Sequence, residues 1–284
     1  MTDFLHAVMT SALARNAVII GLLASVACGI VGTYVVTRRI SYIAASVAHC
    51  VLAGLGAARY VNVVHGWTFP NPVQGALIAA LLAAGVIGWV SLRTREREDT
   101  AIGAVWAIGM AVGILFIYQT PGYNQDLMSY LFGNILLVSN RYLYLTLALD
   151  VFIVAVAAIF YYQLQAVCFD EEFARLRNLR VGLYYLLLLA LTAITVVLLS
   201  MVVGIVLVIA LLTLPTGIAG RFARSMGQMM MLSCLICAVF TVLGLSLSYG
   251  PDLPAGPTII VLTGAAYLLS AAGCYAWGKR IRRG

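Results

Sequence analysis

The sequence has few charged residues for its length. They make up 10% of 284 residues, whereas soluble domains carry about 25%. Hydrophobic residues make up 63%, and the mean hydropathy is +1.02. A water-soluble fold of this composition could not cover its surface with polar groups, so the composition excludes one and favours lipid as the solvent. We expect a single membrane domain over residues 1–284, because each crossing of the hydrocarbon needs about 20 apolar residues.

Lysine is almost absent, since Lys279 is the only one among 17 basic residues. A nucleic-acid-binding surface would need a basic stripe on a soluble fold. The arginines instead stand in small clusters between apolar runs, which is how topology signals are distributed. The net charge of +7 therefore predicts no nucleic-acid partner. The clusters lie at 38–39, 93–97, 175–180, 221–224 and 279–283.

The motifs of soluble catalysis are also missing. The sequence contains no G-x-x-x-x-G-K-[ST], no H-E-x-x-H, no G-x-S-x-G and no D-D-x-x-D. This excludes a P-loop ATP site and disfavours an intramembrane enzyme. We predict no catalytic residue and no bound cofactor, so any pumping would draw on another subunit or on an ion gradient.

Nine apolar runs predict membrane-spanning helices. They lie at about 17–36, 41–61, 73–92, 100–118, 142–162, 181–199, 202–219, 226–248 and 258–277. The run 127–139 is too short to cross alone and predicts a half-helix on the outer side. The expected fold class is an all-α polytopic bundle of about eight to nine spanning helices. The pairs Gly29 and Gly32, Gly85 and Gly88, and Gly109 and Gly113 would let helix backbones approach closely.

The arginine clusters also predict the orientation, because basic residues concentrate on the cytoplasmic side. All five clusters fall on one side if the N-terminus is outside and the C-terminus is cytoplasmic. Arg15 and Arg59 would then lie on the outer side. The prediction is a multi-pass protein of a cytoplasmic membrane.

Few ionisable or metal-ligating side chains lie inside the apolar runs, and within lipid each is a functional hypothesis. His49 is a good ligand for zinc and similar metals, or else a packing residue hydrogen-bonded to a neighbouring helix. Cys50 is next to it, but neighbours on a helix point about 100° apart. Three interpretations of Asp150 stay open: its carboxyl is neutral, it faces a polar cavity, or it forms a hydrogen bond to another helix. Asn134 is a further polar residue of the pathway region.

The segment 168–180 mixes charges with apolar residues. Phe169, Phe173 and Leu176 recur at the three-to-four-residue spacing of a short amphipathic helix. An ordinary solvated loop is the alternative. A solvated loop needs no row of apolar residues. The pattern therefore favours a helix that docks a cytoplasmic partner.

Several stretches, taken in order, resemble the metal-type ABC importer permeases, a family of zinc, manganese and iron uptake systems. The stretches cover almost the whole chain: Gly32-Thr33-Tyr34-Val35-Val36-Thr37-Arg38-Arg39, Ala48-His49-Cys50-Val51-Leu52-Ala53-Gly54, Arg97-Glu98-Asp99-Thr100-Ala101-Ile102-Gly103, Tyr130-Leu131-Phe132-Gly133-Asn134-Ile135-Leu136-Leu137-Val138-Ser139, Leu253-Pro254-Ala255-Gly256-Pro257-Thr258-Ile259-Ile260 and the weaker Phe169-Asp170-Glu171-Glu172-Phe173-Ala174.

The resemblance implies the membrane subunit of an ATP-driven importer for a divalent transition-metal ion in a bacterial inner membrane. It implies two permease copies around a central pathway, cytoplasmic ABC ATPase subunits and an extracytoplasmic metal-binding protein. The ion would pass by alternating access, and His49 matches the family's pathway histidine. The residues that would contact the ATPase are Phe169, Asp170, Glu171, Glu172, Phe173, Arg175 and Arg177.

Two positions depart from the family pattern. Ala45 stands where many members have an aspartate on the same helix face as the histidine, and Ala53 replaces a proline. The missing carboxylate removes a hard oxygen ligand and leaves the identity of the metal open. The alternatives are an importer of a metal chelate or another small nutrient, and a secondary transporter driven by an ion gradient.

Overall fold

The computed structural model of the chain describes residues 2–93, 98–121, 131–133, 135, 138–251 and 253–281. Within these ranges the elements are helices and no strand is present. The helices are α1 (Thr2–Thr10), α2 (Ala12–Thr37), α3 (Ser41–His65), α4 (Pro72–Arg93), α5 (Glu98–Gln119), α7 (Asn140–Ile159), α8 (Tyr161–Phe169), α9 (Glu171–Leu176), α10 (Val181–Val203), α11 (Ile205–Phe222), α12 (Met226–Tyr249) and α13 (Ala255–Ile281).

In the described part of the chain, nine helices are long and apolar enough to cross a membrane, which confirms the expected fold class. They are α2, α3, α4, α5, α7, α10, α11, α12 and α13. The outer half-helix predicted at 127–139 falls largely outside the described residues. The sequence did not predict α1, which packs Phe4 edge-on against Tyr249 with ring centroids 5.9 Å apart.

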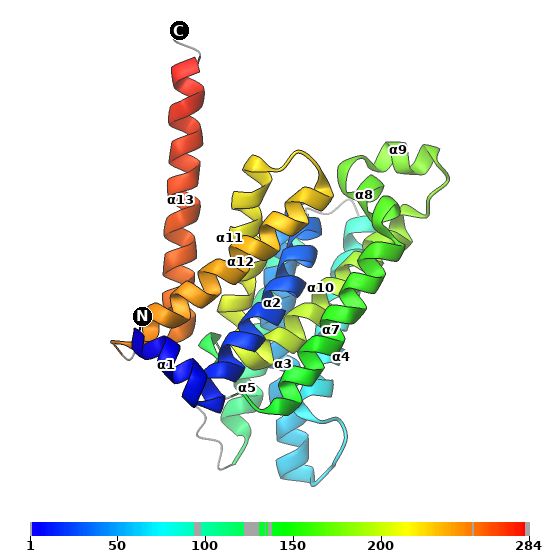
Figure 1. Cartoon of the computed structure of the whole chain (residues 1–284). Coiled ribbons are helices and arrows are strands. Elements are labelled where there is room, and N and C mark those ends of the chain that lie inside the picture. The colour runs from blue at the N-terminus through cyan, green and yellow to red at the C-terminus, as the bar shows by residue number, and fades with distance from the viewer. Residues whose placement is uncertain are drawn as a thin grey trace.

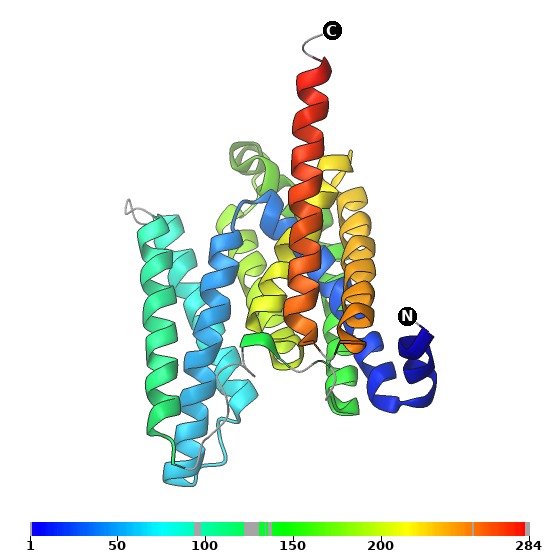
Figure 2. The same cartoon turned by 90° about the vertical axis from the view of Figure 1, so that its left-hand side faces the viewer.

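The spanning helices form two groups, and α10 packs against both. In one group, α3 lies between α4 and α5; in the other, α2 packs against α7, α11 and α12, and α13 covers α11 and α12. Figure 2 shows α3, α4 and α5 side by side at one edge of the molecule and α12 and α13 toward the other. Most of α10 is buried, as its position between the groups requires.

The ends of α2, α4, α11 and α13 gather at the same end of the bundle as α9 (Figures 1 and 2). These are the helix ends at which the sequence places its arginine clusters. The alternating up-and-down path of the helices brings this about. The last turns of α13 extend beyond the other helices at that end, while α1 lies across the opposite end (Figure 1).

Glycines bring several pairs of helices into backbone contact. A Cβ added at Gly29 would lie 2.6 Å from the amide nitrogen of Cys234, and one at Gly113 would lie 2.7 Å from the carbonyl carbon of Leu52. These contacts join α2 to α12 and α5 to α3, as the glycine spacing predicts. The same expectation is wrong for Gly85, because an added Cβ would meet nothing within 4 Å.

Glycine also joins segments that are far apart in the sequence. Gly204 separates α10 from α11 with a φ of 89°, and Gly133 has a φ of 64°. A Cβ at Gly204 would collide with the backbone of residues 131–133, and one at Gly256 would lie 2.8 Å from the carbonyl oxygen of Phe132. Two of the stretches that resemble the permease family therefore meet at the junction of α10 and α11.

Two of the three glycines of α4 allow a matched test of these contacts. Gly75→Ala would place its Cβ 2.6 Å from the Cβ of Ala58 and against the backbone of Gly54, so overpacking should destabilise the protein by about 1–3 kcal/mol. Gly85→Ala meets open space and should be neutral or stabilising by up to about 1 kcal/mol. Thermal unfolding of both variants in detergent measures the difference, and equal melting temperatures would contradict the packing role of Gly75.

Candidate functional site

A short helix, α9, stands at the arginine-rich end of the bundle, and its first turn is set by a local cap. The side chain of Asp170 accepts a hydrogen bond from the backbone amide of Phe173 at 3.0 Å. Glu171 and Glu172 follow in the first turn, where the helix dipole favours negative charge. The helix ends at Leu176, and Asn178 then adopts a left-handed conformation with a φ of 56°. The helix predicted within 168–180 is thus confirmed, with narrower bounds.

The inner side of α9 rests on a small apolar cluster. Ala174 packs with Val167 of α8 and Val181 of α10, and all three are buried. Cys168 is buried beside them, with its Sγ 4.0 Å from the carbonyl oxygen of Tyr34. Burial raises the pKa of the Cys168 thiol to about 12, although the nearby Arg38 guanidinium acts in the opposite direction. Leu179 and Tyr184 pack against this small buried cluster.

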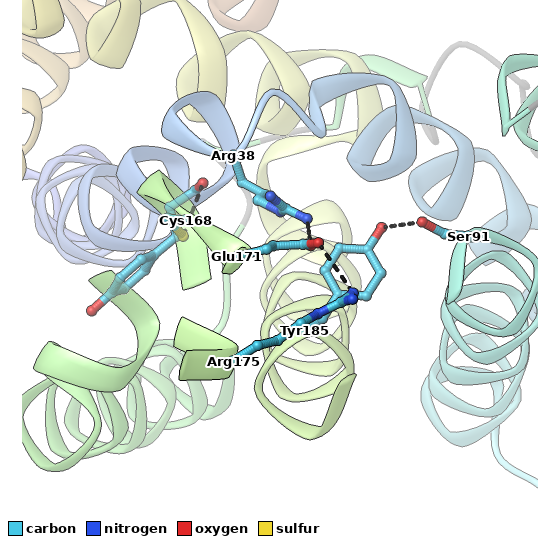
Figure 3. A network of polar contacts seen from close by, with 7 residues as sticks. Arg38, Ser91, Cys168, Glu171, Arg175 and Tyr185 are labelled. Carbon is cyan, nitrogen blue, oxygen red and sulfur yellow. Dashed lines mark hydrogen bonds and ion pairs between the residues drawn. The ribbon is translucent and has the colours of Figure 1, made fainter. Parts of the chain in front are cut away.

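A polar network links α9 to three membrane helices (Figure 3). Arg38, at the end of α2, forms an ion pair with Glu171. Arg175 approaches the other oxygen of Glu171 at 3.7 Å, one turn along α9. The Arg38 guanidinium lies 5.5 Å from the ring centroid of Tyr185 of α10, and the Tyr185 hydroxyl donates to Ser91 Oγ of α4 at 3.2 Å. The network therefore runs from α9 to α2, α10 and α4.

The outer side of α9, together with Phe169 at the end of α8, is apolar and exposed. Leu176 is 84% exposed and Phe169 is 65% exposed, and Phe173 lies between them with the Arg177 guanidinium 5.3 Å from its ring centroid. We call Phe169, Phe173 and Leu176 the α9 ridge. The ridge adjoins a groove of about 720 Å³ between α8 and α9, lined by Tyr162, Gln163, Gln165, Ala166, Phe169, Asp170, Phe173, Arg177 and Leu179. An exposed ridge beside a groove is a surface suited to docking another protein.

His49 lies on α3 and faces α5. Its ring stacks at 4.6 Å and 32° against Trp106, and its Nδ1 is 2.8 Å from the carbonyl oxygen of Ala45. A carbonyl oxygen only accepts, so Nδ1 carries the proton and Nε2 presents a lone pair. A neutral imidazole with this tautomer can ligate a metal through Nε2. The hydrogen bond to Ala45 lies within α3, so the contact of His49 with a neighbouring helix is the stacking on Trp106, and its role as a metal ligand stays a prediction.

Cys50 also reaches α5, although it is one residue further along the helix. Its thiol donates to the carbonyl oxygen of Val105 at 3.4 Å, and a Cβ added at Gly109 would touch its Sγ. Beside Trp106 is a groove of about 410 Å³ lined by Tyr42, Asp99, Ile102, Gly103 and Trp106. The sequence reasoning missed Trp106 as a neighbour of His49. No sequence pattern pairs the two residues, because they lie on different helices.

Asp150 lies away from His49, on α7. It is 5% exposed, and neither carboxyl oxygen has a hydrogen-bond partner among the described residues. Cys28 of α2 and Cys234 of α12 are its ionisable neighbours. The structure thus does not bring Asp150 together with His49 and Cys50. Asn134 lies outside the described residues, so its predicted place in the pathway stays a prediction.

The described residues contain no group of three or more His, Cys, Asp and Glu side chains that could hold a metal ion. Within the described residues of one copy, His49 therefore belongs to no such group. Three further residues of the site were not among the predicted ones: Arg38, Tyr185 and Ser91 connect α9 to the bundle. Arg38 carried a sequence signal, because it ends the first family-like stretch, whereas Tyr185 and Ser91 carried none.

The helical fold, with the α9 ridge and the ion-pair network that links α9 to the bundle, defines a class. This class is a polytopic membrane protein with the architecture of a transporter permease. The chain belongs to the ABC 3 transport family, whose model matches residues 10–273. This match confirms the resemblance seen in the sequence and identifies the chain as a transport permease of the metal type rather than an enzyme.

Individual relatives agree with the family. The chain is 43% identical over 248 residues to a probable metal transport system membrane protein of Chlamydia trachomatis, covering 87% of this chain and 84% of that protein. It is 27% identical to the manganese import system permease protein ScaB of Streptococcus parasanguinis, over 95% and 94% of the two chains. Among solved structures, PsaBC from Streptococcus pneumoniae matches with a TM-score of 0.83 at 29% identity, over 95% and 94% of the two chains.

Thiol labelling tests how firmly α8 and α9 are seated. With a pKa of about 12, Cys168 would be thiolate in only about one part in ten thousand at pH 8, so N-ethylmaleimide should scarcely modify it. A cysteine placed on the ridge by Leu176→Cys should react readily, because that position is exposed. Mass-spectrometric mapping in detergent at pH 8 compares the two sites. Rapid labelling of Cys168 would contradict a seated α8.

Proposed function

We propose that the chain is the membrane-spanning permease subunit of an ATP-driven ABC importer for a divalent transition-metal ion. The observation that carries the proposal is the α9 ridge, which is apolar and exposed and is tied to the membrane helices by an ion-pair network. A motor subunit needs such a surface on which to act. The relative named as a manganese import permease supports manganese as the first ion to test, with zinc and iron beside it.

The side on which the partners bind follows from charge. The arginine clusters share the end of α9, so this end and the C-terminus face the cytoplasm. Cytoplasmic ABC ATPase subunits bind the α9 ridge and supply the hydrolysis that this chain does not perform. An extracytoplasmic metal-binding protein delivers the ion at the opposite end. The membrane is the cytoplasmic (inner) membrane of a bacterium.

The pathway lies between two copies of the chain. The part of one copy that the structure describes has no complete metal site, so two copies of His49, one from each permease, present their Nε2 atoms to the passing ion. Weak coordination suits transport, because an ion must leave as well as enter. ATP binding and hydrolysis alternate the access of this pathway. The transported metal is the substrate.

Uptake into proteoliposomes tests the function. Vesicles would contain the chain, its ATPase and its metal-binding protein, with Mn²⁺, Zn²⁺ and Fe²⁺ offered in competition. We expect ATP-dependent uptake of one metal. His49→Ala should lower it about tenfold or more, because it removes a pathway ligand, as happens when partners of a metal site are lost.

Cys50→Ala is the matched control, since it changes the next residue on the same side of α3 and should preserve uptake. If His49→Ala also preserves uptake, His49 is a packing residue and selectivity lies in the binding protein. Uptake of a metal chelate but of no free ion would replace the metal-ion proposal. Uptake that continues without the ATPase would favour an ion gradient as the energy source.

The α9 ridge predicts where the ATPase binds. Leu176→Asp places a charge on the most exposed residue of the ridge and should weaken ATPase binding by about tenfold or more. The side chain is exposed, so the permease itself should keep its stability. Met9→Asp, at an equally exposed position of α1 at the opposite end, is the control. Titration of the detergent-solubilised permease with its ATPase measures both, and equal affinities would rule out the ridge as the docking surface.

A further inference from the structure

Glu171 faces the bundle, although it belongs to the helix that meets the partner. Its carboxylate pairs with Arg38, while the neighbouring Glu172 is exposed. We propose that the Arg38–Glu171 ion pair is a latch that makes α9 and α2 move together, and that Glu171 is a positioning residue and not an ATPase contact. This inference rests on the proposed function, because it concerns how movement at the ATPase reaches the pathway.

Helix α9 needs a link of this kind. It has six residues, and a helix this short is not stable on its own. Its apolar seat is Ala174 against Val167 and Val181, flanked by Ala166, Leu179 and Tyr184, and α9 has few other contacts with the bundle. A force applied to the exposed ridge could therefore slide α9 over the bundle without moving it. The ion pair prevents this slip, because it ties the first residue of α9 to the end of α2.

The two charges stand where the helices themselves favour them. Arg38 caps the C-terminal end of α2, where the helix dipole is negative, and Glu171 begins α9, where it is positive. The side chains are only 24% and 30% exposed, so water screens the pair less than it screens a surface ion pair. Arg38 is held from a second side by the ring of Tyr185. The pair is thus a directed contact with little freedom to exchange partners.

The latch reaches both groups of helices. Through Arg38 it reaches α2, which packs against α7, α11 and α12. Through the ring and hydroxyl of Tyr185 it reaches α10 and then Ser91 of α4. Helix α4 packs along α3, which carries His49. A displacement of α9 would therefore be passed to the pathway helix through α4 and to the other group through α2 (Figure 3).

Neutral variants with matched controls separate the latch from a partner contact. Glu171→Gln and Arg38→Gln remove one charge each and keep the side-chain size. Glu172→Gln and Arg39→Gln remove the same charges from the adjacent exposed positions. Each variant is reconstituted with the ATPase and the metal-binding protein. ATPase retention, ATP hydrolysis and Mn²⁺ uptake are measured on the same vesicles, and melting temperatures report folding.

We expect both latch variants to retain the ATPase and to hydrolyse ATP, while Mn²⁺ taken up per ATP hydrolysed falls about tenfold, which is the range of a broken coupled pair. The double variant should be no worse than either single one. The charge exchange Arg38→Glu with Glu171→Arg, made in an Arg175→Gln background to avoid a new repulsion on α9, should recover most of the uptake per ATP. The control variants should behave as the wild type.

Three results would overturn the latch. Loss of ATPase binding in Glu171→Gln would make this residue a partner contact. Unchanged uptake per ATP in both single variants would show that α9 moves α2 without the pair. A charge exchange that folds but recovers nothing would show that the pairing itself is unimportant. A wild-type chain without ATP-dependent uptake would instead overturn the proposed function and the latch with it.

Discussion

The absence of water in the hydrocarbon is the constraint on which this structure depends. Each backbone amide and carbonyl must be satisfied within the protein, so the spanning segments are helices. Several hydroxyl side chains follow the same rule by bonding the carbonyl one turn earlier, as Thr33 does with Gly29 and Thr192 with Leu188. Lipid gives these helices no hydrophobic reason to associate, so close packing must hold them together.

Glycine supplies that close packing at the contacts that organise the bundle. Gly29 brings α2 against α12, and Gly113 brings α5 against α3. Gly204 is the point at which the loop around Gly133 and the start of α13 meet the junction of α10 and α11. Segments that are far apart in the sequence become neighbours there because no side chain separates their backbones.

The candidate site has two parts, α9 at one end of the bundle and His49 among the spanning helices. At the arginine-rich end, α9 exposes an apolar ridge and turns Glu171 inward to Arg38. Among the spanning helices, His49 is oriented by Ala45 and Trp106 and keeps one nitrogen as a potential ligand. In the proposed importer, the ridge would meet a motor subunit and His49 would face a second copy of the chain across the pathway.

The sequence by itself determined the fold class, the nine spanning helices and the amphipathic α9, because apolar length, arginine placement and helical spacing are local properties. It also marked His49, Cys50 and Asp150, since a polar residue in an apolar run stands out. Only the tertiary structure decided which of these meet: Trp106 packs on His49, Asp150 lies elsewhere, and Glu171 faces inward. The direction of a side chain depends on the neighbouring helix, and no local pattern records that neighbour.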